Sequence, residues 1–407
     1  IVVVGRFSGS QSLAAVGATT ALIYLFTNLF IGISLGANVL AARYYAAGKH
    51  EEMSETVHTA MMFALISGII MIFVGLFFSR LALEIMGTPS DVIDQATLYM
   101  RIYFLGMPFF MLYNYGAAIL RAVGDTKRPL IFLIISGVVN ACLNMLLVIV
   151  FHLDVAGVAI ATVTSQFISC VLVIGCLYRT KSSYQLRFSR LKIRKEYLKP
   201  ICQVGIPAGI QSTVINFSNA LLQSSVNSFG STTMAGYTAA NNIFGFLYVS
   251  VNAITQACMS FTSQNYGLRK LKRMDKILID CLILTVVVSL VLGGGVYLFG
   301  AEILRLYTEE AEVIRCGIEI FAYTTVTYFL CGIMDLFPGA LRGMDRSTVP
   351  MILSVIGTVG TRIVWVFWLF PAHRSLAFLF ISYPASWLIT IAMQVICFYL
   401  VRRKVHG

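Results

Sequence analysis

Charge is scarce in this sequence. Only 12% of its 407 residues are charged, against about 25% in a typical soluble domain. The nine Cys form no CxxC pair and have no His at metal-ligand spacing, which argues against zinc sites and disulfide frameworks. Nucleotide-binding, metalloprotease and serine-hydrolase motifs are also missing. These absences argue against a soluble enzyme, and no cofactor is expected.

Long apolar runs take the place of charge, and 58% of the residues are hydrophobic. A run of about 20 apolar residues crosses the roughly 30 Å hydrocarbon layer as a helix. The short alternating segments of a membrane β-barrel are not found. After an apolar stub, Ile1 to Gly5, the runs predict eleven spans. These are 12–42, 56–79, 96–120, 129–151, 155–178, 201–226, 232–263, 277–299, 317–341, 349–370 and 376–400.

Basic residues are distributed unevenly between the segments that join these spans. With alternate segments assigned to the cytoplasm, 23 of the 30 Lys and Arg lie on that side and six on the other, while Arg362 lies inside a span. This positive-inside pattern predicts a multi-pass protein of the cytoplasmic membrane with both termini in the cytoplasm. It explains the net charge of +12 without nucleic acid. Anionic lipids at the cytoplasmic face are the expected partner of the basic segments.

Two segments repeat at a separation of 221 residues: LRAVGDTKRP from Leu120 and LRGMDRSTVP from Leu341. Six spans per repeat is an even number, so both halves enter the membrane in the same direction, as in some secondary transporters. At this offset Ile1 corresponds to Leu222, inside the seventh span. The first of twelve spans is therefore expected to be incomplete in this sequence.

These patterns predict an all-α polytopic membrane protein with two pseudo-symmetric six-helix bundles. The N-terminal bundle is expected over 1–178 and the C-terminal bundle over 201–407. Residues 179–200 contain eight Lys and Arg and are expected to form a basic cytoplasmic linker. A connector lying along anionic headgroups and a site for a regulatory partner both remain open for this linker.

The repeated segments place an Arg at the end of one span, a small turn after it, and a Pro at the start of the next. Such a segment can be a plain structural turn or can take part in gating at the cytoplasmic face. The residues concerned are Arg121, Asp125, Pro129, Arg342 and Pro350.

Polar side chains inside the spans are candidates for a binding cavity, because hydrocarbon disfavours them unless they face protein or water. Amides of the seventh span recur at steps of three and four and share one helical face, and the two amides of the fifth span are four residues apart. Cavity lining and hydrogen bonding between helices both remain open. The candidates are Asn140, Asn144, Gln211, Asn216, Asn219, Gln223 and Arg362.

Asp335 is an acidic residue placed well within a span, in the tenth. A carboxylate at that depth is a candidate for binding a coupling ion. A structural ion pair with Arg362 is the alternative.

The segments VGRFSGSQSLAAVGATT, GISLGANVLAARYYAAG and VGIPAGIQS, with the two repeated turns, resemble the multidrug and toxic compound extrusion (MATE) family, most of all its bacterial branch. The resemblance implies two six-helix bundles around a central cavity. It also implies exchange of protons or sodium ions for amphipathic organic cations across the bacterial inner membrane, and a monomer is expected. A lipid-linked precursor flippase of the related superfamily is the alternative; its cavity should carry clustered cations, whereas Arg362 alone lies within a span.

Labelling of single cysteines tests the predicted orientation. In a Cys-free background, Arg190→Cys in the basic linker should react with an impermeant maleimide only after the membrane is permeabilised, because the linker is expected in the cytoplasm. A cysteine in the 227–231 segment should react in intact cells. Labelling of position 190 from outside intact cells would contradict the topology.

Overall fold

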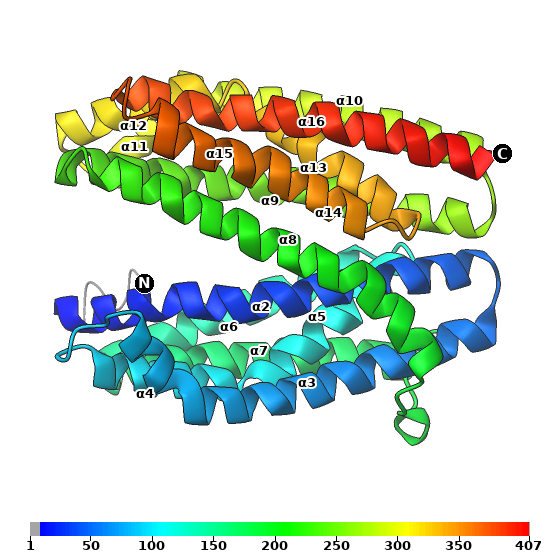
Figure 1. Ribbon diagram of the computed structural model, residues 1–407. Helices are drawn as coiled ribbons and strands as arrows, with labels where there is room; N and C mark the ends of the chain where they lie inside the picture. Colours follow the sequence, from blue (N-terminus) through cyan, green and yellow to red (C-terminus); the bar gives the residue numbers. More distant parts are fainter. Residues whose placement is uncertain (1–8, 407) are drawn as a thin grey trace. The chain divides into compact units, whose positions relative to one another are not determined.

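The computed structural model describes residues 9–406, without the side chains of 9–11, 13–14, 21 and 404–406. The predicted stub, Ile1 to Gly5, lies outside the described residues. Every regular element within them is helical (Figure 1). The chain divides into two compact units, Ile1–Gly209 and Ile210–Gly407, and the division falls inside α8 (Lys195–Asn227).

Eight of the described helices are long and apolar enough to cross a membrane, or up to ten spans if each of two bent pairs counts as one. Helix α8 has 33 residues, but its amide and hydroxyl side chains keep it outside this set. With α8 included, each of the eleven predicted spans coincides with a helix or a broken helix, which confirms the all-α membrane fold. The elements of the N-terminal unit are α2 (Gly9–Ala46), α3 (His50–Ile85), α4 (Ile93–Leu105), α5 (Met107–Ala122), α6 (Lys127–Met145), η1 (Leu146–Val150) and α7 (Asp154–Arg179).

The C-terminal unit follows the same order. Its elements after α8 are α9 (Ser231–Gly267), α10 (Leu271–Leu298), α11 (Gly300–Arg305), α12 (Ala311–Thr324), α13 (Tyr328–Gly343), α14 (Thr348–Ser354), η3 (Val355–Gly360), α15 (Thr361–Val364), η4 (Trp365–Leu369) and α16 (Leu376–His406). The chain bends by 47° between α4 and α5 and by 51° between α12 and α13. The breaks at Gly106 and Thr327 are again 221 residues apart, so the repeat extends to the broken spans.

The two repeated turns have the same backbone geometry. In the first, Asp125 N–H donates to Leu120 C=O (2.9 Å) and Gly124 has a φ of 90°. In the second, Arg346 N–H donates to Leu341 C=O (2.9 Å), and Asp345 takes the left-handed position with a φ of 62°. This is the glycine-type end of a helix, in which a left-handed residue lets the next N–H reach a terminal carbonyl. Asp replaces Gly in the second copy because Asp tolerates this conformation better than most residues.

Glycines bring α2 and the first part of α8 into close contact. A side chain at Gly32 would overlap the backbone of Gly209, and one at Gly36 would overlap the carbonyl of Ile201. A side chain at Gly205 would overlap α2 in the same way. The pair Gly32 and Gly36 of α2 therefore meets the pair Gly205 and Gly209 of α8. Small residues four positions apart let helices approach closely in a membrane.

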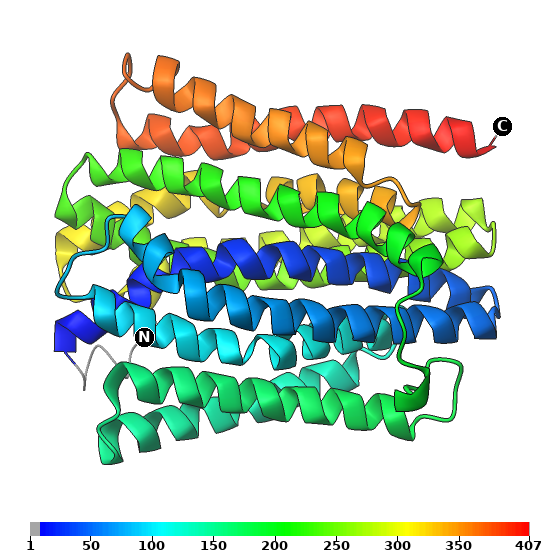
Figure 2. The same ribbon diagram turned by 60° about the horizontal axis from the view of Figure 1, so that its bottom comes forward.

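The two units have different interiors. Buried apolar side chains of the N-terminal unit form one large cluster across α2 to α5 and α7. Those described in the C-terminal unit form four separate clusters. Buried polar side chains lie among the clusters of the C-terminal unit, on α8 to α10 as well as on α12 to α16. Helices α14 and α15 lie beside α16 in both views (Figures 1 and 2), and their shared surface contains the densest set of these polar groups.

Candidate functional site

A ladder of buried polar side chains joins the α14–α15 segment to α16. Each helix contributes a polar residue at every fourth position, so one face of each presents the whole set. All six side chains are nearly or fully buried. The rungs, hereafter the polar ladder, are Gln394–Ser354 (2.9 Å), Thr390–Thr358 (3.1 Å) and Arg362–Ser386 (3.3 Å).

The local backbone adapts to this ladder. Residues Val355–Gly360 and Trp365–Leu369 are π-helical, a wider turn that is frequent at functional sites. Gly357 lies where a Cβ atom would overlap the hydroxyl of Thr390. Its lack of a side chain lets α16 approach closely enough for the middle rung to form.

Arg362 stands at one end of the ladder and is only 3% exposed. Its Nη1 donates to Asn219 Oδ1 (2.7 Å) and Ser218 Oγ (3.4 Å) of α8. The guanidinium carbon lies 4.6 Å from the ring centroid of Tyr383, a cation–π contact. Within the described part of the chain Arg362 has no carboxylate partner, so the alternative ion pair with Asp335 is not formed.

A second buried arginine, Arg342, ends α13. Its Nη2 donates to Gln211 Oε1 of α8 (2.6 Å), while its Nε has no hydrogen-bond partner. Asp335 lies two turns earlier on α13 and interacts electrostatically with Arg342 and with Tyr248 of α9. Asp335 is half-buried and makes no hydrogen bond or ion pair with any described residue. A carboxylate without a direct partner inside a span can accept a proton or bind a cation.

The predicted amide face of α8 is therefore divided between different surroundings. Gln211 and Asn219 each accept from a buried arginine. Gln223 donates to Asn227 Oδ1 (2.8 Å) on the same helix, and Asn216 is exposed. The structure brings two of these amides to the arginines and leaves one available to solvent or ligand.

The remaining predicted residues lie on α6 and in or beside the two repeated turns. Asn144 donates to Asn140 Oδ1 (2.9 Å), and Asn140 Nδ2 donates to Ser165 Oγ of α7 (3.3 Å). At the turns, Arg121 is half-buried and Asp125 pairs with Arg128 (3.3 Å). The carbonyl groups of both turn prolines accept from buried side chains, namely Pro129 from Tyr113 (3.0 Å) and Pro350 from Gln394 (2.7 Å). These contacts fit structural turns, and a gating role stays a prediction.

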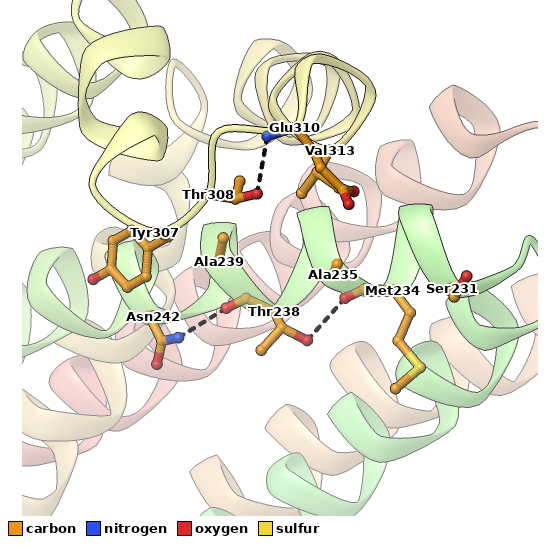
Figure 3. A pocket seen from close by; sticks show the side chains of 10 residues that line it. All are labelled: Ser231, Met234, Ala235, Thr238, Ala239, Asn242, Tyr307, Thr308, Glu310 and Val313. Atoms are coloured by element: carbon orange, nitrogen blue, oxygen red, sulfur yellow. Dashed lines mark hydrogen bonds between the residues drawn. The ribbon is translucent and has the colours of Figure 1, made fainter. Parts of the chain in front are cut away.

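A pocket of about 500 Å³ opens against the first turns of α9 in the C-terminal unit (Figure 3). Its other wall is the connection from α11 to α12. The pocket was not predicted from the sequence, although polar residues at 231, 238 and 242 on one face of α9 were a signal. The lining residues are Ser231, Met234, Ala235, Thr238, Ala239, Asn242, Tyr307, Thr308, Glu310 and Val313.

This pocket offers mainly hydrogen-bond acceptors. Thr238 uses its hydroxyl proton on Met234 C=O (2.8 Å), and Asn242 uses a side-chain N–H on Thr238 C=O (3.0 Å), as Figure 3 shows. Their oxygens remain to accept. Glu310 adds a carboxylate, and the lining of the pocket contains no Lys, Arg or His. Tyr307 is 49% exposed and Met234 is 45% exposed.

Comparison with known proteins gives the family. The MatE family model matches residues 1–146 and 207–368. The chain belongs to the MatE family. This MATE protein is a multi-pass membrane transporter and not an enzyme.

Individual relatives agree with this assignment. The chain is 28% identical over 401 residues to the probable multidrug resistance protein YoeA of Bacillus subtilis, covering 96% of this chain and 86% of that protein. It is 22% identical to the multidrug export protein MepA of Staphylococcus aureus, covering 87% and 78% of the two chains. A mutant of the MATE transporter VcmN of Vibrio cholerae has the same fold, with a TM-score of 0.91 at 18% identity over 99% of this chain and 91% of that one.

Replacement of Asn219 tests the arginine contacts. Asn219→Leu should lower the free energy of unfolding by about 2 kcal/mol, because it leaves a charged N–H of Arg362 without its acceptor. Asn216→Leu on the same helix is the matched control and should change stability little, because Asn216 is exposed. Thermal unfolding of the purified protein in detergent measures both. Equal melting temperatures for the two variants would contradict the proposed importance of this contact.

Proposed function

We propose that this MATE transporter exports amphipathic organic cations by alternating access of its two halves, in exchange for protons or sodium ions. The names of YoeA and MepA support multidrug export as the activity. We further propose a monomer with cytoplasmic termini and with anionic lipids against its basic cytoplasmic segments, in keeping with the distribution of Lys and Arg.

The chemistry of the pocket in Figure 3 is the observation that carries the substrate class. Acceptor oxygens and a carboxylate favour a cationic group, and an exposed tyrosine ring adds cation–π attraction. A methionine side chain adapts to flat hydrocarbon surfaces of different shape. Together, Glu310, Tyr307 and Met234 suit a positively charged molecule with an apolar body.

Asp335 is proposed as the coupling residue. Ionising a carboxylate inside a span is costly unless a cation, a proton or water relieves it. Because no described residue pairs with Asp335 directly, an ion from solution can take that place. A proton and a sodium ion are both compatible with a single carboxylate.

The flippase alternative is less favoured. A pyrophosphate headgroup needs several cationic side chains that can reach it. Among the buried arginines in the spans of the C-terminal unit, Arg342 and Arg362 donate to neutral partners on α8 and Arg402 pairs with Asp275 instead, and the pocket lining carries no positive charge.

Neutralising Glu310 tests the substrate site. Glu310→Gln should weaken binding of a fluorescent cationic dye to the purified transporter by roughly five-fold, because a partly exposed charge contact is worth about 1 kcal/mol. Glu309→Gln is the matched control, since Glu309 is adjacent but does not line the pocket. Binding of an uncharged analogue should be unchanged in both. Identical dye affinities for the two variants would remove the pocket from the substrate site.

Neutralising Asp335 tests coupling. Asp335→Asn should abolish drug-dependent collapse of a pH or sodium gradient in everted vesicles while dye binding at the pocket persists. Asp280→Asn on α10 is the control, because Asp280 is exposed. If Asp335→Asn with Arg342→Gln restores the lost transport, Asp335 serves to balance Arg342 and the coupling role is wrong.

A further inference from the structure

The basic linker is fastened to the N-terminal unit along α3. The linker is the segment between α7 and α8, drawn as a green loop in Figure 1. Its backbone makes three hydrogen bonds to two side chains of α3, hereafter the linker seam. Arg187 N–H donates to His58 Nε2 (3.0 Å), the Thr59 hydroxyl donates to Lys192 C=O (3.4 Å), and Arg194 N–H donates to Thr59 Oγ1 (3.3 Å).

The partners of His58 define its protonation. A backbone carbonyl, Ser54 C=O, lies 2.6 Å from Nδ1, and a carbonyl only accepts. A backbone N–H, that of Arg187, points at Nε2, and an N–H only donates. The imidazole must therefore carry its proton on Nδ1 and a lone pair on Nε2. His58 is 1% exposed, so water does not offer an easy substitute for either bond.

We propose that His58 is a pH-sensitive latch that holds the linker on α3 while neutral and releases it when protonated. A second proton on Nε2 would face the N–H of Arg187, donor against donor. The bond that anchors the first part of the linker would be lost, and a charged ring would be left buried. Opening the seam exposes the ring to water and relieves both costs, so acid favours the open form.

The other charged or titratable groups around the seam come from α2 and the turn after it, α3, the linker and α8. They are Tyr44 and Lys49; His50, Glu51, Glu52 and Glu55; Arg187, Arg190, Lys192 and Arg194; and Glu196 and Tyr197. The pairs Arg190–Glu51 (3.7 Å) and Arg194–Glu55 (2.5 Å) hold the linker as well. Burial raises the pKa of Tyr197 above its usual value, so that side chain stays neutral.

The linker is also the covalent connection into α8, in which the two compact units divide. Release of the seam would lengthen the free chain before α8 and remove a restraint on that helix. Acidification on the linker's side of the membrane would then change the freedom of α8 whichever substrate is exported, so the latch does not depend on the proposed substrate.

Hydrogen exchange of the intact transporter in nanodiscs tests the latch. Peptides covering 182–194 should exchange faster at pH 5.5 than at pH 7.5 after correction for the intrinsic rate, by up to about tenfold per pH unit, the limit for one proton. His58→Gln should remove this dependence and keep the seam closed, because its amide oxygen still accepts from Arg187 without titrating. His50→Gln, at an exposed neighbour, should keep the wild-type response.

Two results would overturn the proposal. One is corrected exchange of the wild-type linker that is equal at both pH values. The other is a pH response that survives in His58→Gln. The ¹⁵N spectrum of histidine-labelled protein gives an independent readout, since His58 must show its proton on Nδ1 at pH 7.5; a proton on Nε2 would contradict the geometry.

Discussion

The packing of the C-terminal unit depends on how the positive charge of Arg362 is buried away from water. Hydrocarbon offers no hydrogen bonds, so Arg362 must find all of its partners in protein. It does so on α8 and α16 at once, through Asn219, Ser218 and Ser386, with the ring of Tyr383 below the guanidinium. Each partner satisfies the charge only while its helix stays in place. The second part of α8 is therefore held by these polar contacts together with the buried Leu222 and Val226, whereas its first part packs on α2 through glycines.

The two halves derive from one repeat but use it differently. Ser165 and Ser386 are 221 residues apart, and each accepts a hydrogen bond at 3.3 Å from the preceding span, from Asn140 in the first half and from Arg362 in the second. The counterpart of Asp335 at the same offset is Asn114, which donates to a carbonyl of its own helix. Equivalent serine hydroxyls thus accept a hydrogen bond from a neutral amide in one half and from a charged guanidinium in the other.

The sequence predicts those parts of the fold that depend on local chemistry. Apolar runs located the spans, and the repeated turns were recognised because a left-handed position, an Arg and a Pro leave a mark in the sequence. The polar ladder was missed, since its residues on α14–α15 and α16 become a set only when the two helices are known to be neighbours. Arg362 was assigned to a cavity, or to Asp335, because a charge in a span suggests an opposite charge, while the structure gives it neutral partners. The pocket of Figure 3 was not predicted, because one of its walls is the connection between α11 and α12, and residue spacing does not give the position of that connection.

The distribution of charge in the C-terminal unit bears on how exchange could work. Two of its buried arginines, Arg342 and Arg362, donate to neutral partners on α8. Asp335 is half-buried on α13 without a direct partner, and Glu310 lines the pocket of Figure 3. On the proposed function, the coupling ion would be drawn to Asp335 and the cationic drug to Glu310. Arg342 interacts electrostatically with Asp335, so a cation at Asp335 is held less firmly than at an isolated carboxylate, because like charges repel strongly where water is scarce. A coupling ion held in this way can leave again, and an antiporter requires that its ion be released in every cycle.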